Sequence, residues 1–492
     1  MAETFLPSTT TDNPASGRPS IVSLIVIALL SAVLLLVPVK VTALTILALF
    51  CLSVAAYLLF SVLQGNFSPI LLTWAAIFPL GYYFLSFPRE KPWFTFDRAM
   101  VGLLLLGLIA TAWSKSVPIA RTIRAAGVAW SLFLLAAVVS IAGGQDTLSA
   151  THALVDAFLL PALLGLYILR VFPAGKYLKQ IHILVALMSI YLAAIGIAEV
   201  YSGVDLLPLP GAGDYFAGSP GLQLLRVNGP FLSNTSYGLI GLTSFFLLRF
   251  FKKAAESPLP FWLRCLHAAG LASALAVALM PLFRSIALTL LFVFAIEALQ
   301  VRKRTFRLAF VVLIATLLGG FLWLSSRFPD LYEERISGAD NLYARVAQYQ
   351  QSFALFLSHP LTGVGFNGFH NAAEKATKYV TEYNGVEALD YPHSNLTAVL
   401  AETGILGFIP YVVSQVLLVA AFRQVRRQGT PIAELVWKGF LCVFLSYWVS
   451  GLSLASGYYS DLNLWFVFAV TILYRFASCQ PANTLQVGTS PG

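Results

Sequence analysis

Charged side chains are scarce in this sequence, in which Asp, Glu, Lys and Arg make up 11% of 492 residues. A soluble globular domain carries about 25% charged residues. Hydrophobic residues make up 58% of the chain, which leaves too few polar residues to cover a soluble domain. The composition therefore excludes the soluble classes and predicts a protein that crosses the membrane many times. Because the net charge of +9 lies in short clusters between apolar blocks, it indicates membrane orientation and no nucleic-acid partner.

Cysteine is also rare. The four cysteines are Cys51, Cys265, Cys442 and Cys479, and all lie in or beside apolar segments. Their spacing fits neither a disulfide framework nor a zinc site. Several catalytic patterns are absent as well: the chain has no H-E-x-x-H, no D-x-D acidic pair, no Walker loop and no G-x-S-x-G elbow. The sequence therefore predicts neither a cofactor nor a bound metal, and its chemistry has to use Arg and His.

Apolar runs long enough to cross a bilayer follow one another along the chain, and they predict an all-α bundle of about 12–14 transmembrane spans. The runs are 21–39, 41–63, 68–87, 98–114, 121–142, 152–172, 178–201, 230–251, 262–283, 285–301, 307–325, 395–422, 435–454 and 461–476. We expect residues 1–20 and 479–492 to be disordered cytoplasmic tails. The bundle then covers 21–478, with the polar segment 326–395 inserted.

The orientation follows from basic clusters in alternate loops, which predict the cytoplasmic side. These clusters are Lys115, Arg121 and Arg124; Arg170, Lys176 and Lys179; Arg249, Lys252 and Lys253; Arg302, Lys303, Arg304 and Arg307; and Arg423, Arg426 and Arg427. The loops between them, including 202–228 and 326–395, are then expected to face outward. The segment 88–98 is charged yet falls on the outer side.

The polar segment 326–395 is the longest break in the hydrophobicity and is the candidate cap of an active site. Within it, apolar residues of 341–358 recur at spacings of three and four, which predicts an amphipathic helix. The following stretch, 359–369, has one Pro and several Gly residues and predicts a turn. We considered its part 363–368 as a hinge for a mobile cap.

Three outward-facing places have residues suited to chemistry: Arg226, Arg284 and His393. Guanidinium groups bind phosphate oxygens bidentately and stay charged, and His is a base with a near-neutral pKa. Arg226 is also explained as an interfacial anchor. Arg284 lies between two apolar runs, where an arginine marks a functional site.

Other polar residues have simpler explanations. We interpret His359 and His370 as structural or exposed, and Glu199, Glu402 and Asp156 as counter-charges for the arginines. Displacement of a lipid diphosphate from a sugar suits an Arg and His site, because the leaving group needs positive charge and the attacking hydroxyl needs a base. A polysaccharide or lipid transporter is the alternative. It is less favoured because the sequence shows no internal repeat and its charges gather at one face.

Four stretches together resemble the family of O-antigen ligases and polymerases, which are bacterial envelope glycosyltransferases. They are R-V-N-G-P-F-x-S-N-T from Arg226, F-R-S around Arg284, N-L-Y-A-R-V-A-Q-Y-Q-Q-S-F-A-L-F-L-S-H-P-L-T-G-V-G-F-N-G-F at 341–369, and P-H-S-N-L-T-A-V-L-A-E-T-G-I-L-G-F-I-P-Y at 392–411. In that family an Arg before G-x-F, a later Arg, H-P-x-x-G-x-G and H-S/N-N…E-x-G occur in this order. The resemblance covers roughly residues 150–455.

The resemblance implies a GT-C-like membrane glycosyltransferase in the bacterial inner membrane. Its donor would be a glycan on undecaprenyl diphosphate, and its acceptor either the lipid A core, for a ligase, or a growing glycan, for a polymerase. By position, Arg226 and Arg284 would bind the diphosphate with support from Arg345, and His393 would be the base. Asn395 and Glu402 belong to the same motif as supporting residues. The reaction would take place at the periplasmic face, without metal or nucleotide sugar.

Overall fold

The computed structural model describes residues 39–89, 92–112, 119–144, 146–209, 216–217, 224–255, 258–300, 308, 311–312, 315, 319, 340–388, 392, 394–452 and 456–478. Contacts divide the chain into two units, Met1–Asn66 and Phe67–Gly492. In the first unit, helix α2 covers Val39–Leu63. All contacts discussed below lie within the second unit.

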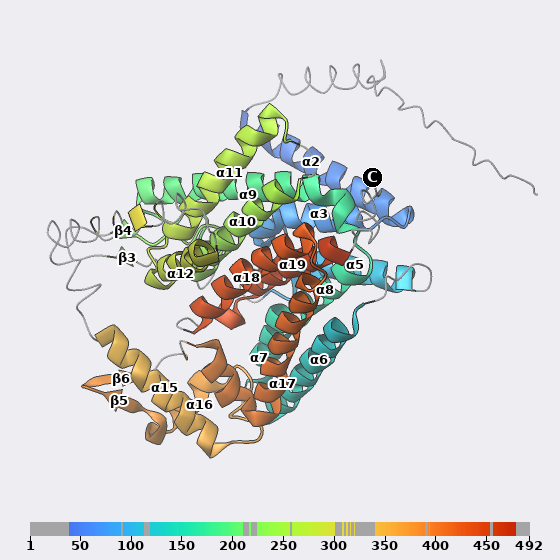
Figure 1. The fold of residues 1–492 in the computed structure, drawn as a ribbon. Coiled ribbons are helices and arrows are strands. Elements are labelled where there is room, and N and C mark those ends of the chain that lie inside the picture. The colour runs from blue at the N-terminus through green and yellow to red at the C-terminus, as the bar shows by residue number, and fades with distance from the viewer. Residues whose placement is uncertain are drawn as a thin grey trace, which may run out of the picture. The chain divides into compact units, whose positions relative to one another are not determined.

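Nearly all the described residues of the second unit are helical (Figure 1). The helices are α3 (Ser68–Ile77), η1 (Phe78–Leu80), α4 (Gly81–Phe84), α5 (Phe96–Ala112), α6 (Arg121–Ala142), α7 (Thr147–Leu154), the π-helical η2 (Val155–Leu159), α8 (Leu160–Arg170), α9 (Ala174–Ser202), α10 (Asn234–Ala254), α11 (Phe261–Leu279), α12 (Arg284–Gln300), α15 (Asp340–Ser358), α16 (Phe369–Lys375), η4 (Thr377–Tyr379), α17 (Asn395–Arg426), α18 (Pro431–Gly451), η5 (Ser456–Tyr458) and α19 (Ser460–Ser478). Short antiparallel pairs join β1 (Ser86–Phe87) to β2 (Phe94–Thr95), β3 (Phe216–Ala217) to β4 (Leu224–Leu225), and β5 (Thr381–Tyr383) to β6 (Val386–Ala388).

Six stretches of the described residues are long and apolar enough to cross a membrane: Arg121–Ala142, Thr147–Arg170, Ala174–Ser202, Phe261–Leu279, Asn395–Arg426 and Pro431–Gly451. Shorter apolar helices accompany them. The predicted all-α, polytopic membrane bundle is therefore confirmed. Of the predicted spans, 21–39 and most of 307–325 lie outside the described residues, so the total of 12–14 spans remains a prediction.

Helix α10 is buried along almost its whole length. Small polar residues such as Ser236, Thr243 and Ser244 are buried along it together with Leu and Phe side chains, so other helices surround it. Gly241 allows α11 to approach closely, since a Cβ there would lie 2.6 Å from Cγ1 of Val277. On the side of α19, the indole Nε1 of Trp465 donates to the hydroxyl of Ser244 at 3.2 Å. These contacts make α10 a central element of the bundle.

Helices α6 and α17 run side by side (Figure 1), with an aromatic cluster between them. The ring centroids of Phe133 on α6 and Tyr411 on α17 are 5.2 Å apart. Phe158 of η2 packs edge-on against Phe366 at a centroid distance of 5.6 Å. Because Phe366 belongs to the turn that follows α15, the polar segment contributes a buried side chain to the core of the bundle.

The described part of the polar segment, residues 340–388, is called the cap below. It contains α15, α16, η4 and the β5–β6 hairpin beside one end of α17 (Figure 1, orange). A small core formed by Leu355, Phe369, Ala373 and Tyr379 closes over Ala401 of α17. The prediction that this segment contains short helices is confirmed.

The predicted amphipathic helix is present as α15, but its apolar stripe does not form its packed face. Leu342 and Phe353 are 62% and 55% exposed, whereas Gln351 is fully buried. The reason is the packing partner, a hairpin that presents backbone oxygen atoms. The amide of Gln351 donates to the carbonyl of Ala388 in β6 at 2.9 Å. A polar face therefore satisfies hydrogen bonds that an apolar face could not.

Candidate functional site

The turn after α15 is bound to a break in α17. At Gly404 the backbone has φ of +60° and leaves the helical conformation. The N–H of Ile405 therefore donates to the carbonyl of Pro360 at 2.9 Å instead of closing a helical bond to Ala401. The Ala401 carbonyl accepts from the N–H of Val364 at 3.0 Å. The turn thus replaces the hydrogen bonds that the helix loses at the break.

The next turn of α17 is completed in the same way. Leu406 donates its N–H to the carbonyl of Leu361 at 3.2 Å. The carbonyl of Glu402, which would accept that bond in a regular helix, accepts from the hydroxyl of Ser140 on α6 at 2.5 Å. Backbone groups at the break in α17 are therefore hydrogen-bonded by the cap on one side and by α6 on the other.

The side chain of Glu402 ties the cap to this break. Its carboxylate oxygens accept from the backbone N–H of Asn367 at 3.0 Å and of Phe369 at 3.3 Å. The hydroxyl of Tyr458 in η5 donates to the same carboxylate. Burial, with the charge of Glu402 as a second cause, raises the pKa of Tyr458 well above its ordinary value, so its hydroxyl remains a donor. Glu402 is 2% exposed and has three donors from two separate segments.

The glycines of the turn allow its close approach to the bundle. A Cβ at Gly363 would lie 2.2 Å from the carbonyl carbon of Glu402, and Gly363 has φ of +72°. A Cβ at Gly365 would lie 2.9 Å from the Cα of Gly144. These glycines therefore let the turn pack closely against the bundle. The hinge at 363–368 stays a prediction.

Asn395 joins the start of α17 to the segment that also contacts Glu402. Its Oδ1 accepts from the N–H of Gly457 at 2.6 Å. Asn463 of α19 donates through Nδ2 to the carbonyls of Gly457 and Ala157, both at 2.7 Å. The two predicted supporting residues, Asn395 and Glu402, therefore both contact the short stretch Gly457–Tyr458.

Arg226 lies in a turn that is positioned by a buried carboxylate. Glu199, at the end of α9, accepts from the N–H of Gly229 at 3.1 Å. Gly229 has φ of +54°, and a Cβ there would lie 2.6 Å from the ring of Tyr237, so only glycine fits. From this turn the Cζ of Arg226 lies 5.4 Å from the ring centroid of Phe283, within cation–π range.

Phe283 directly precedes Arg284, the first residue of α12. The structure therefore brings the Arg226 guanidinium to the chain segment that contains the second predicted arginine. Around it, a Cβ at Gly238 of α10 would lie 2.5 Å from Cδ1 of Ile286, so α10 and the start of α12 are tightly packed.

The other predicted residues are less completely placed. The side chain of Arg284 and the whole of His393 lie outside the described residues. The chain neighbours of His393, Pro392 and Ser394, are both buried at the start of α17. Arg345 is half-buried on α15, with no hydrogen bond or ion pair to another described residue. Its proximity to the other arginines is therefore not established by a contact.

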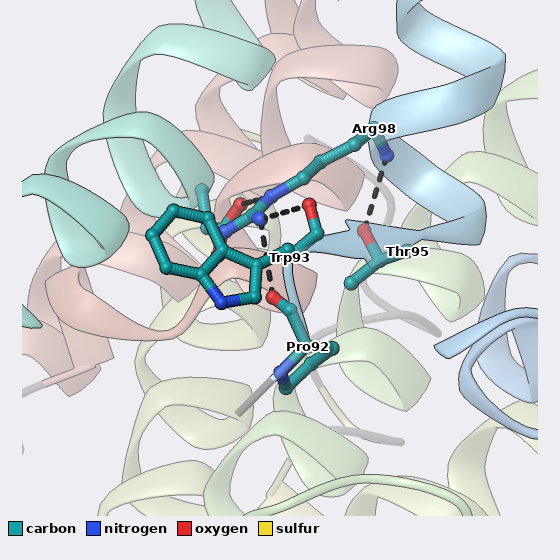
Figure 2. A network of polar contacts seen from close by, with 5 residues as sticks. Pro92, Trp93, Thr95 and Arg98 are labelled. Carbon is teal, nitrogen blue, oxygen red and sulfur yellow. Dashed lines mark hydrogen bonds and ion pairs between the residues drawn. The ribbon is translucent and has the colours of Figure 1, made fainter. Parts of the chain in front are cut away.

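One expected counter-charge is confirmed. Arg98 forms a bidentate pair with Asp156, with Nε to Oδ1 and Nη2 to Oδ2 both at 2.7 Å. Its Nη1 donates to the carbonyls of Pro92 and Trp93, and its backbone N–H donates to the hydroxyl of Thr95 (Figure 2). The charged outer segment 88–98 therefore has a structural explanation, because it is tied to η2.

Glu199 and Glu402 are not counter-charges of this kind. Within the described part of the chain neither forms an ion pair, and each accepts from backbone N–H groups. The expectation was wrong for these two because the loops that contact them present amides and not guanidinium groups. Their carboxylates fix the two turns from which the rest of the site is built.

Sequence reasoning missed the partners of the supporting residues, above all Tyr458, Asn463 and Ser140. None of them lies near a recognisable pattern. The two aromatics in G-Y-Y-S between two apolar spans were the available signal for Tyr458. Tyrosine combines an apolar ring with a hydroxyl that needs a partner when buried.

The family comparison agrees with this geometry. Residues 269–412 match a family model described as O-antigen ligase. No curated protein matches the chain. The matched range contains Phe283 and the start of α12, the cap and the break in α17. Arg226 and Glu199 precede this range in the sequence. Residues 269–412 of this multi-pass membrane protein, which carry the cap and the α17 break, are thus similar to the O-antigen ligase family.

Proposed function

We propose that the protein transfers a glycan from undecaprenyl diphosphate to an acceptor hydroxyl of the lipid A core. The family match supports an O-antigen ligase or polymerase type of reaction. The observation that carries the proposal is the contact of Arg226 with the ring of Phe283, directly before Arg284. This contact places the Arg226 guanidinium beside the chain segment that contains Arg284.

The arginines bind the diphosphate. As the bond between the sugar C1 and the diphosphate oxygen breaks, negative charge develops on the leaving group, and positioned guanidinium groups stabilise it. Stacking on Phe283 restricts the Arg226 side chain, so less conformational freedom is lost when it binds. In this proposal Arg345, on α15 of the cap, supports the same group.

His393 accepts the proton from the acceptor hydroxyl while the hydroxyl oxygen forms the new bond to C1. Undecaprenyl diphosphate leaves with the electron pair of the broken bond. His393 directly precedes the N-terminal end of α17, which Asn395 and Glu402 hold in place. These two residues are positioning residues, since their polar atoms are occupied by the protein. The reaction uses the donor and the hydroxyl without a nucleotide sugar.

The site faces the periplasm of a bacterial inner membrane. Thr122 beside Arg121 donates to Gln424 beside Arg423 at 2.7 Å, so two basic clusters share the end of α17 that lies away from the cap. Basic loops stay in the cytoplasm, which leaves the cap on the outer side.

A reconstituted assay tests this function. Proteoliposomes receive a glycan on undecaprenyl diphosphate, with or without lipid A core, and wild type is compared with His393→Ala. We expect core-attached glycan that requires both the core and His393. Longer donor-linked chains formed without core would identify a polymerase using the same site.

Two further variants and one control make the assay specific. Arg284→Ala should abolish transfer. His359→Ala is the matched control, because His359 is exposed and its ring bonds, among the described residues, to its neighbour Ser358 alone. Wild-type transfer by His393→Ala and Arg284→Ala contradicts the assignment. Lipid flipping that persists in a variant lacking Arg226, Arg284 and His393 would favour a transporter.

A further inference from the structure

A cavity lies at the end of the bundle away from the cap. It has a volume of about 350 Å³ and is lined by Ile119, Ala120, Leu169, Val425, Gln428, Tyr474, Arg475, Ala477 and Ser478. On α17, Glu402 and Val425 are separated by about 35 Å at 1.5 Å per residue, which is close to the thickness of a bilayer core. The cavity is therefore distinct from the proposed transfer site.

Arg475 is the charged residue that lines this cavity. It is 6% exposed, and its Nε donates to the carbonyl of Phe172 at 3.0 Å. Among the described residues, that is its one hydrogen bond, and it has no carboxylate partner. A guanidinium has five N–H donors, and burying its charge without a counter-ion is costly. The other N–H donors of Arg475, a residue of the cavity lining, form no hydrogen bond with a described residue.

One described carboxylate at this end of the bundle, that of Glu434, already has cationic partners. Glu434 accepts from Nε of Arg426 at 2.9 Å and lies 3.4 Å from Nζ of Lys438. The charge of Arg426 is further shared with the ring of Trp437 at 5.7 Å. Glu434 therefore does not neutralise Arg475, and none of the described residues that line the cavity is acidic.

The N-terminal end of α6 is a second source of positive potential at the cavity. Ala120, a lining residue, is the N-cap of the 22-residue helix α6 and has no side-chain cap. The first backbone N–H groups of a helix have no intrahelical acceptors and favour an anion. Gln428, which is exposed, adds an amide to the lining.

We propose that this cavity binds a phosphoryl group, with Arg475 and the start of α6 as its donors. The group has the size and charge that the lining favours: several acceptor oxygens, held by a planar guanidinium and helix amides. It belongs either to an anionic phospholipid of the leaflet opposite the cap or to free phosphate. This end of the bundle thereby has an anion site separate from glycan transfer.

The test uses the full chain, purified in detergent and delipidated, with thermal unfolding followed by tryptophan fluorescence. Inorganic phosphate, phosphatidic acid and diacylglycerol are titrated separately. Ligands that bind the folded state raise the midpoint by mass action. We expect stabilisation by phosphatidic acid if the source is lipid, or by inorganic phosphate if it is free, and none by diacylglycerol.

Three variants complete the design. Arg475→Gln should raise the half-saturating ligand concentration about tenfold, because charge-assisted hydrogen bonds to the ligand are lost. Gln428→Glu places a carboxylate on an exposed lining position and should weaken binding similarly without disturbing the core. Arg427→Gln, the exposed α17 C-cap residue outside the lining, is the control for charge and should bind as wild type.

Several results overturn the proposal. They are an unchanged response in Gln428→Glu, an equal loss in Arg427→Gln, stabilisation by diacylglycerol equal to that by phosphatidic acid, and no stabilisation by either source of phosphate. Because Gln428→Glu does not depend on the Arg475–Phe172 bond, the test remains decisive if Arg475→Gln fails to fold.

Discussion

Two buried charged side chains, Glu402 and Arg475, lie near opposite ends of the membrane bundle and have opposite hydrogen-bonding situations. Glu402 has three donors from the cap and η5 for its two carboxylate oxygens. Arg475 has one acceptor for five donors, beside a cavity. A saturated buried charge holds segments together, whereas an unsaturated one next to free volume is suited to a ligand. Buried charge alone therefore does not identify a binding site.

The largest expected effect is that of Glu402→Ala. Removing the carboxylate leaves the N–H groups of Asn367 and Phe369 without their acceptor, and the loss should be about 4 kcal/mol of the free energy that docks the cap. Limited proteolysis should then cut within 359–376, where the wild type resists. Transfer should fall with it. A resistant cap in Glu402→Ala would contradict the role of this carboxylate.

Gly363→Ala should undock the same turn by steric overlap. The added Cβ would meet the Glu402 carbonyl carbon at 2.2 Å, at a backbone φ of +72°, for a cost of about 3 kcal/mol. Limited proteolysis and thermal unfolding measure this loss of stability. Gly385→Ala is the matched control, because its φ is also positive but it has no atoms within 4 Å. If both variants lost the same stability, the loss would come from the positive φ alone and not from steric overlap.

A smaller loss is expected for Tyr458→Phe, which removes one of the three donors to Glu402 and retains the ring. Since two donors remain, the cost should be about 1–1.5 kcal/mol. A double-mutant cycle compares the thermal unfolding of wild type, Tyr458→Phe, Glu402→Ala and the double variant. The double variant should lose less than the sum of the single losses, and strict additivity would argue against the bond.

The smallest effect on stability is expected at Arg475, when phosphate and phospholipid are absent. Arg475→Gln gives up one hydrogen bond to Phe172 but also relieves a buried charge, so the change should stay within about 1 kcal/mol. Thermal unfolding of delipidated protein decides this. A loss as large as that of Glu402→Ala would mean that Arg475, too, is purely structural.

The sequence predicted the secondary-structure elements better than the contacts between them. Helix α15 and the turn after it follow from apolar spacing and from Pro and Gly content. The exposed position of Phe353 could not be predicted, because the packed face depends on where the β5–β6 hairpin lies. Apolar spacing indicates amphipathicity but not which face meets protein.

The same limit applied to the site. The H-P-x-x-G-x-G turn and the E-x-G motif are recognisable in the sequence, and Glu402 and Asn395 belong to the motifs that carry the resemblance. The break of α17 at Gly404 and its attachment to the turn could not be predicted, because the hydrogen bonds from Ile405 to Pro360 and from Ser140 to Glu402 join distant parts of the chain. Arg475 lies at the end of an apolar run, where the sequence favours an interfacial anchor over a binding residue.

The most direct test of the proposed transfer site compares the same substitution at two arginines in the reconstituted assay. Arg226→Lys keeps the charge but removes the planar fork over Phe283, so transfer should fall at least about tenfold. Arg427→Lys, at the exposed end of α17, should transfer at the wild-type rate. Equal rates for the two variants would contradict a diphosphate site built on Arg226.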